Sequence, residues 1–127
     1  MEKLDSRDRR FLAACAAAIV LGAAVTGVLF RRAGTGEALG YGYTQASGRL
    51  GPVAMADPLL VPAALGALIA REDPPGPWLT LVPGSNDRAM VALLRAGLRY
   101  EGFPGILAST RPFPGLERYL PASFGLL

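Results

Sequence analysis

Residues 28–45 read VLFRRAGTGEALGYGYTQ and decide the fold class. Two β-prone runs, residues 28–32 and residues 39–45, flank a glycine-rich loop at residues 33–37. Two such runs around a short glycine-containing loop are typical of a β-hairpin. The segment therefore predicts two neighbouring antiparallel strands.

The second of these runs has an alternating pattern. Side chains two residues apart point to the same face of a strand, so Leu39, Tyr41 and Tyr43 are predicted to share one face. Tyr41 and Tyr43 then have two interpretations, which the sequence leaves open. They either line a substrate groove or form cross-strand packing pairs.

The chain after the hairpin predicts a third strand and a helix. A turn at Ser47 and Gly48 leads into a short β-prone run over residues 49–55. Asp57 then provides an N-cap side chain and Pro58 suits the first helical position. The following apolar period predicts a helix that ends near Ala70.

A fourth strand and a second helix are predicted next. Residues 78–82 are compact and apolar, and either Ser85 or Asn86 is placed to cap a helix over residues 85–96. Gly97 is a natural C-terminal stop. The helical period predicts an inner face made of Ala89, Met90, Leu93 and Leu94, and an outer face made of Arg88, Arg95 and Arg99.

The last part of the chain is apolar but broken. Residues 103–108 resemble a strand that Pro104 and Gly105 interrupt. Together with the preceding elements, this order predicts an α/β or α+β sandwich over residues 27–127, with a mixed sheet flanked by two helices.

Residues 11–30, FLAACAAAIVLGAAVTGVLF, contain no charge. Twenty apolar residues are about the length of a transmembrane helix, so the run predicts either a membrane span or two shorter elements. In the second interpretation a helix covers residues 6–21, within an apolar N-terminal helical segment over 1–26, and a strand covers residues 25–32. We prefer this interpretation because the hairpin requires residues 28–30 as strand.

Composition excludes several kinds of chemistry. The chain has no histidine, so an imidazole base or a His-ligated metal is excluded, and its single cysteine, Cys15, excludes an internal disulfide. We therefore predict no metal site. The 13 basic residues are scattered among 10 acids, which is not the pattern of a nucleic-acid interface.

Four stretches resemble the GCN5-related N-acetyltransferase (GNAT) family. They are the hairpin quoted above, the strand GRLGPVAMADP, the strand and helix WLTLVPGSNDRAMVALLRAGLRYEG, and the ending RPFPGLERYLPASFGLL. The most specific is the helix that begins at Asn86 and continues through Ala89, Leu93 and Gly97. The resemblance covers residues 27–127 and is greatest to the C-terminal portion of larger, tandem members. It implies a chain that is truncated or degenerate on its N-terminal side.

The resemblance implies a site for acetyl-CoA as co-substrate. Its pantetheine arm would meet the strand at Gly51, Val53, Ala54 and Met55, and would also bond Asn86. From the residues alone, Asn86 is equally a plain helix cap. No catalytic residue is assigned.

The turn over residues 56–60 departs from the family pattern. Members cradle the pyrophosphate on a glycine-rich turn at a helix N-terminus, whereas this turn has no glycine. Asp57 would repel a phosphate, and Pro58 lacks an N–H donor. We therefore expect any affinity for acetyl-CoA to be weaker than that of a complete member.

The implied function is acetyl-CoA-dependent N-acetyltransfer to an amine, in the cytoplasm, with a homodimer left open. The alternative is a small single-pass membrane protein, spanning through residues 11–30, whose remaining part only binds partners. Arg49 could meet a phosphate and Glu101 could act as a base, although both are more often plain surface charges.

Overall fold

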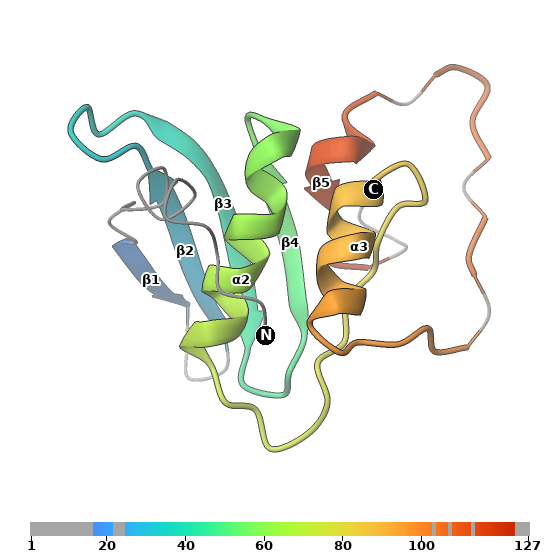
Figure 1. Cartoon of the computed structure of the whole chain (residues 1–127), viewed down its shortest axis with the longest axis horizontal. Coiled ribbons are helices and arrows are strands. Elements are labelled where there is room, and N and C mark those ends of the chain that lie inside the picture. The colour runs from blue at the N-terminus through green and yellow to red at the C-terminus, as the bar shows by residue number, and fades with distance from the viewer. Residues whose placement is uncertain (1–16, 22–24, 103, 107, 113, 124–127) are drawn as a thin grey trace.

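The fold is an antiparallel β-sheet with two helices. The computed structural model describes residues 17–21, 25–102, 104–106, 108–112 and 114–123. The sheet has five strands in sequence order, and every neighbouring pair is antiparallel (Figure 1). Its strands are β1 (Ala17–Leu21), β2 (Val25–Arg31), β3 (Ala38–Gln45), β4 (Leu50–Met55) and β5 (Tyr119–Leu120).

The predicted hairpin is confirmed as β2 and β3. Val28 pairs with Gly42, and the register shifts between Phe30 and Arg31, where the loop begins. Leu39 follows this shift and is buried in the core, so it does not continue the face of Tyr41 as the alternation predicts. The sheet is antiparallel and not mixed as predicted. β2, β3 and β4 follow one another through short loops, and β5 returns after both helices to pair antiparallel with β4.

The described residues of the apolar N-terminal run, 17–21 and 25–30, lie in two strands. β1 pairs with β2 along its whole length, from Ala17 opposite Leu29 to Leu21 opposite Val25. The helix predicted over residues 6–21 is therefore wrong for residues 17–21, and the rest of it lies outside the described residues. Pairing with β1 supplies hydrogen-bond partners to the edge of β2, which an isolated helix would leave open.

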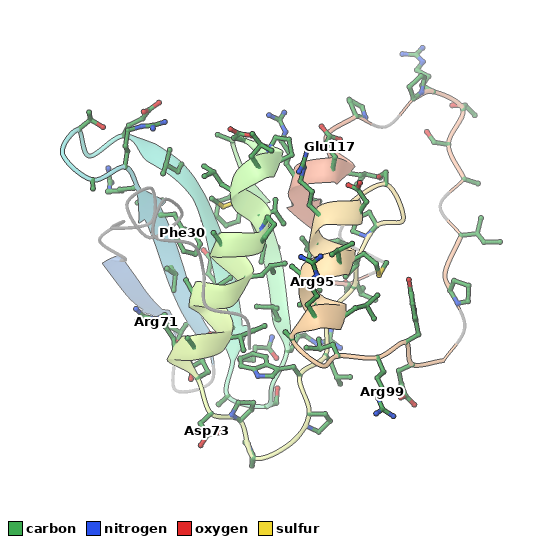
Figure 2. The ribbon with its side chains drawn as sticks, in the orientation of Figure 1. Phe30, Arg71, Asp73, Arg95, Arg99 and Glu117 are labelled. Carbon is green, nitrogen blue, oxygen red and sulfur yellow. The ribbon has the colours of Figure 1, made fainter. Side chains whose placement is uncertain are left out.

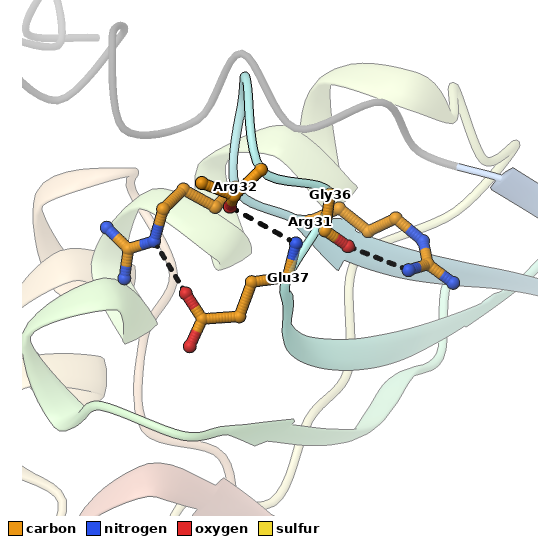
Figure 3. Close-up of polar contacts among 5 residues, drawn as sticks. Arg31, Arg32, Gly36 and Glu37 are labelled. Carbon is orange, nitrogen blue, oxygen red and sulfur yellow. Dashed lines mark hydrogen bonds and ion pairs between the residues drawn. The ribbon is translucent and has the colours of Figure 1, made fainter.

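Polar contacts close the loop between β2 and β3 (Figure 3). The Arg32 Nε donates to the Glu37 carboxylate over 2.8 Å, and the Arg31 guanidinium donates to the Gly36 carbonyl over 2.8 Å. The backbone N–H of Gly36 also donates to the Arg32 carbonyl. Both guanidinium contacts are exposed, so they contribute little to stability but fix the course of the loop.

The two predicted helices are confirmed, with small differences at their ends. The first begins as a 3₁₀ turn, η1 (Pro58–Leu60), and continues as α2 (Val61–Arg71). The Asp57 side chain accepts from the Leu59 N–H, as its N-cap role predicts. The second helix is α3 (Asp87–Arg95), whose N-cap is Asn86.

The core lies between the sheet and α2, and α3 packs beside α2 (Figure 1). Phe30 lies in this core, whereas Arg71 and Arg95 are exposed on the helices (Figure 2). On α3 only Ala89 and Leu93 are buried, and Leu94, predicted on the inner face, is exposed. The core comprises Val28, Phe30, Leu39, Leu50, Val53, Met55, Val61, Ala64, Leu65, Leu68, Ala89, Leu93 and Leu120.

Two predicted strands are absent from the described residues. Residues 78–82 are extended but make only one bridge, Leu79 with Arg49, in the parallel direction. Further along β4 the same edge is occupied by β5, so residues 80–82 have no strand to pair with. In the segment 103–108, the described residues 104–106 and 108 carry no strand, and Ile106 is 93% exposed.

Candidate functional site

The residues that the resemblance assigns to acetyl-CoA lie on two elements. Gly51, Val53, Ala54 and Met55 belong to β4, and Asn86 begins α3. β4 is bordered on one side by β3 and on the other by two short partners from the C-terminal half of the chain. The free backbone that a pantetheine arm would need is therefore limited to this second edge.

The beginning of the second edge is paired with the segment that leads to α3. The Leu50 N–H donates to the Leu79 carbonyl, and the Leu79 N–H donates to the Gly48 carbonyl, both over 2.9 Å. The two segments of the chain run parallel at this bridge. Among the described residues the two segments share one bridge, and no further pairing follows it.

β5 takes the rest of this edge. Val53 pairs with Leu120, and Ala54 pairs with Tyr119. A Cβ added to Gly51 would lie 3.0 Å from the carbonyl oxygen of Pro121, so the chain after β5 also approaches β4 closely. Two of the four predicted β4 residues, Val53 and Ala54, are thus paired with β5 along this second edge.

The Asn86 side chain is fully buried, and among the described residues only its amide oxygen has a hydrogen-bond partner. Its Oδ1 accepts from the Ala89 N–H over 3.1 Å, which is the helix-cap contact, while its Nδ2 has no hydrogen-bond partner within the described part of the chain. The buried Thr80 Oγ1, in the preceding extended segment, also has no partner. A buried donor without a partner costs about 1–3 kcal/mol, so it is uncommon unless a water or a ligand satisfies it.

The turn before α2 has already used its N–H groups. The Leu59 N–H donates to the Asp57 side chain, and the Leu60 N–H donates to the Asp57 carbonyl over 3.0 Å. The Val61 N–H donates to the Pro58 carbonyl, and the next residue, Pro62, has no N–H. The turn therefore offers few donors to a pyrophosphate.

A second concave feature lies on the sheet around Ala54. Registered pairing places Leu29, Tyr41, Ala54 and Tyr119 in one row across four strands. A cavity of about 520 Å³ opens on this row, and Arg118 is the one charged residue among those that line it. The Arg118 guanidinium donates to the Ala56 carbonyl over 3.1 Å.

Tyr41 and Tyr43 lie side by side on β3, with ring centroids 6.0 Å apart in an edge-to-face arrangement. The Tyr43 ring lies against Gly27, where an added Cβ would come within 2.8 Å of it. Tyr41 is 41% exposed and lines the cavity. Burial, and to a lesser extent the phenol of Tyr41, raise the pKa of Tyr119 above its ordinary value.

The remaining predicted residues lie outside both features. The Arg49 guanidinium donates to the Ala122 carbonyl over 2.9 Å and so fastens the chain after β5. Glu101 is exposed. Within the described residues, no cluster of acidic or cysteine side chains could hold a metal ion. No helix among them is long and apolar enough to cross a bilayer.

Sequence reasoning missed Arg118 and Tyr119 as site residues. They lie on the short 3₁₀ helix η2 (Leu116–Arg118) and on β5, neither of which has a periodic pattern long enough to detect. Gly115, with a positive φ of 88°, is the one local signal for the turn that begins them.

Comparison with protein-family models, with curated proteins and with solved structures found no match to this chain.

Proposed function

We propose that this chain is an acetyl-CoA-binding domain of the N-acetyltransferase type, with the pantetheine arm bound between β4 and the start of α3. The observation that carries the proposal is the unpaired Nδ2 of Asn86. An asparagine that only caps a helix needs its Oδ1 alone, whereas a bound amide would also take its N–H donors.

The order of the elements gives further support. Four antiparallel strands, a helix, a segment parallel to the start of the fourth strand, and a second helix follow one another. This segment makes no further bridge to β4 after Leu79. The second unpaired polar atom, the Thr80 Oγ1, belongs to the next residue. Polar atoms that lack partners at such a separation favour a ligand with amide groups.

In the proposed reaction a neutral amine attacks the thioester carbonyl carbon of acetyl-CoA. A backbone N–H of β4 stabilises the oxyanion that forms, and the C–S bond then breaks. The amine loses a proton, and the departing thiolate takes one up as coenzyme A. Products are the acetylated amine and the free thiol. A chain that lacks the acid and base for these transfers would bind the thioester without turning it over.

Two features predict weak binding. The donors of the turn at residues 57–61 are used within the chain, and Asp57 carries a negative charge there. Each charge-assisted hydrogen bond that is missing costs about 1.5–3 kcal/mol, or about one to two decades in affinity. β5 also competes for the edge of β4.

Calorimetric titration of acetyl-CoA into Asn86 variants tests the proposal. Serine keeps the cap but cannot replace the amide N–H, so Asn86→Ser should retain stability and lose acetyl-CoA affinity. Asn86→Ala should also lower the free energy of unfolding by about 0.5–2 kcal/mol. Ser85→Ala, one residue earlier and exposed, is the control. Unchanged affinity in Asn86→Ser would mean that Asn86 is only a cap.

A further inference from the structure

The cavity over Ala54 is separate from the buried amide of Asn86. It opens on the row Leu29, Tyr41, Ala54 and Tyr119, which crosses β2, β3, β4 and β5. Its volume of about 520 Å³ lies in the range of small-molecule sites, about 300–1,000 Å³. The cavity is open to solvent and large enough for a small ligand.

Ala54 makes this row concave. Its methyl group lies between two tyrosines, because Tyr41 is its registered neighbour on β3 and Tyr119 its registered neighbour on β5. Neighbouring strands are about 4.8 Å apart, so a ring centred over Ala54 would lie about that far from each flanking strand. Aromatic rings interact best at centroid separations of about 4.5–7 Å. The row thus has the dimensions of a slot for one flat ring.

The walls of the slot are held in place. The ring of Tyr43 lies over Gly27 and meets the edge of Tyr41, which limits how far Tyr41 can move away from the slot. The Tyr119 side is anchored at its neighbour Arg118, through the hydrogen bond to the Ala56 carbonyl. Prearranged walls reduce the entropy that is lost when a ligand binds.

The charge at the slot selects an anion. Arg118 lines the cavity and no acid does so. Among the described residues, Arg118 forms no ion pair within 4.0 Å, although Glu117 precedes it in the chain. Its hydrogen bond to the Ala56 carbonyl uses one guanidinium nitrogen, which leaves other N–H donors of the five for a carboxylate.

We infer that this cavity binds a small aromatic monocarboxylate, with its ring over Ala54 between Tyr41 and Tyr119 and its carboxylate on the Arg118 guanidinium. Apolar contact comes from Leu29, which also lines the cavity. The cavity shares Ala54 and Met55 of β4 with the proposed acetyl-CoA site, but neither Asn86 nor the turn before α2 lines it, so the inference does not require acetyl-CoA to bind.

Titration of 2-naphthoate into ¹⁵N-labelled protein tests the inference. We expect amide shifts at Gly40, Ala54 and Tyr119, and no comparable shifts with uncharged 2-naphthamide. Shifts of equal size with the amide, or none near Ala54 with the acid, would overturn it. Acetyl-CoA is absent from this experiment, so its outcome is independent of the proposed function.

Variants separate the ring contact from the charge. Arg118→Gln should weaken 2-naphthoate binding about tenfold, and Arg118→Lys should restore part of the loss. Ala54→Leu fills the slot and should abolish binding without removing a charge. Arg49→Gln is the matched control, because Arg49 also donates to one backbone carbonyl but does not line the cavity. Unchanged affinity in folded Ala54→Leu or Arg118→Gln protein, judged by circular dichroism, would overturn the inference.

Discussion

Two side chains in this protein each make a structural hydrogen bond and keep further N–H donors for a ligand. The Asn86 amide caps α3 with its oxygen and leaves its nitrogen unpaired in the interior. The Arg118 guanidinium donates to the Ala56 carbonyl and forms no ion pair within 4.0 Å among the described residues. In both cases the structural contact fixes the side chain while part of its bonding capacity remains for a ligand.

Tyr119 should make the fold sensitive to alkaline pH. Its phenol has a raised pKa because burial, and secondarily Tyr41, disfavour the phenolate. As pH rises past about 10, the unfolded chain loses this proton while the folded chain keeps it, so the free energy of unfolding falls. Urea unfolding at about pH 8 and about pH 10.5 should show this loss, and Tyr119→Phe should reduce it. An equal loss in both proteins would contradict the assignment.

Asp57 should limit the affinity for acetyl-CoA. Asp57→Asn keeps a side-chain oxygen for the Leu59 N–H and removes the negative charge near the pyrophosphate. We expect calorimetry to show tighter acetyl-CoA binding by several-fold, with a larger gain at low ionic strength. Asp73→Asn makes the same charge change beyond the other end of α2 and is the control. Equal acetyl-CoA affinities of the Asp57→Asn and Asp73→Asn variants would contradict this role of the Asp57 charge.

Among the elements, the two-residue strand β5 contributes to both candidate sites. Its two residues pair with Val53 and Ala54, bury Leu120 in the core, and place Tyr119 beside the cavity. The same short strand therefore completes one candidate site and restricts the other.

Loosening β5 should expose the edge of β4. Leu120 is fully buried, so Leu120→Ala should lower the free energy of unfolding by about 2–5 kcal/mol. Because β5 and the pantetheine arm compete for the same backbone, the folded fraction should bind acetyl-CoA more tightly than the parent chain. Leu65→Ala, which removes a buried side chain of α2 and changes neither β5 nor α3, controls for general loosening. Calorimetry below the unfolding temperature makes the comparison, and equal affinities in both variants would contradict competition.

Across the whole molecule, the parts that sequence predicts well are those with local signals. Asp57 with Pro58, Asn86 and Gly97 mark helix ends by their own backbone and side-chain chemistry, and these ends were predicted closely. The β2–β3 hairpin follows from two β-prone runs and the loop between them.

The parts that sequence predicts poorly depend on distant partners. Ala17–Leu21 is alanine-rich and reads as helix, but its pairing with β2 makes it a strand. Residues 78–82 read as a strand, but β5 occupies the edge they would need. The candidate cavity needs Tyr41 and Tyr119, which only the sheet register brings to the two sides of Ala54.

The central claim, that acetyl-CoA binds along β4 at the start of α3, is tested most directly by titrating acetyl-CoA into ¹⁵N-labelled protein and following every backbone amide. The account predicts saturable shifts at Gly51, Val53, Ala54, Met55 and Asn86, with a dissociation constant weaker than micromolar because the phosphate donors are missing. The absence of shifts at these amides, or a submicromolar dissociation constant, would contradict it.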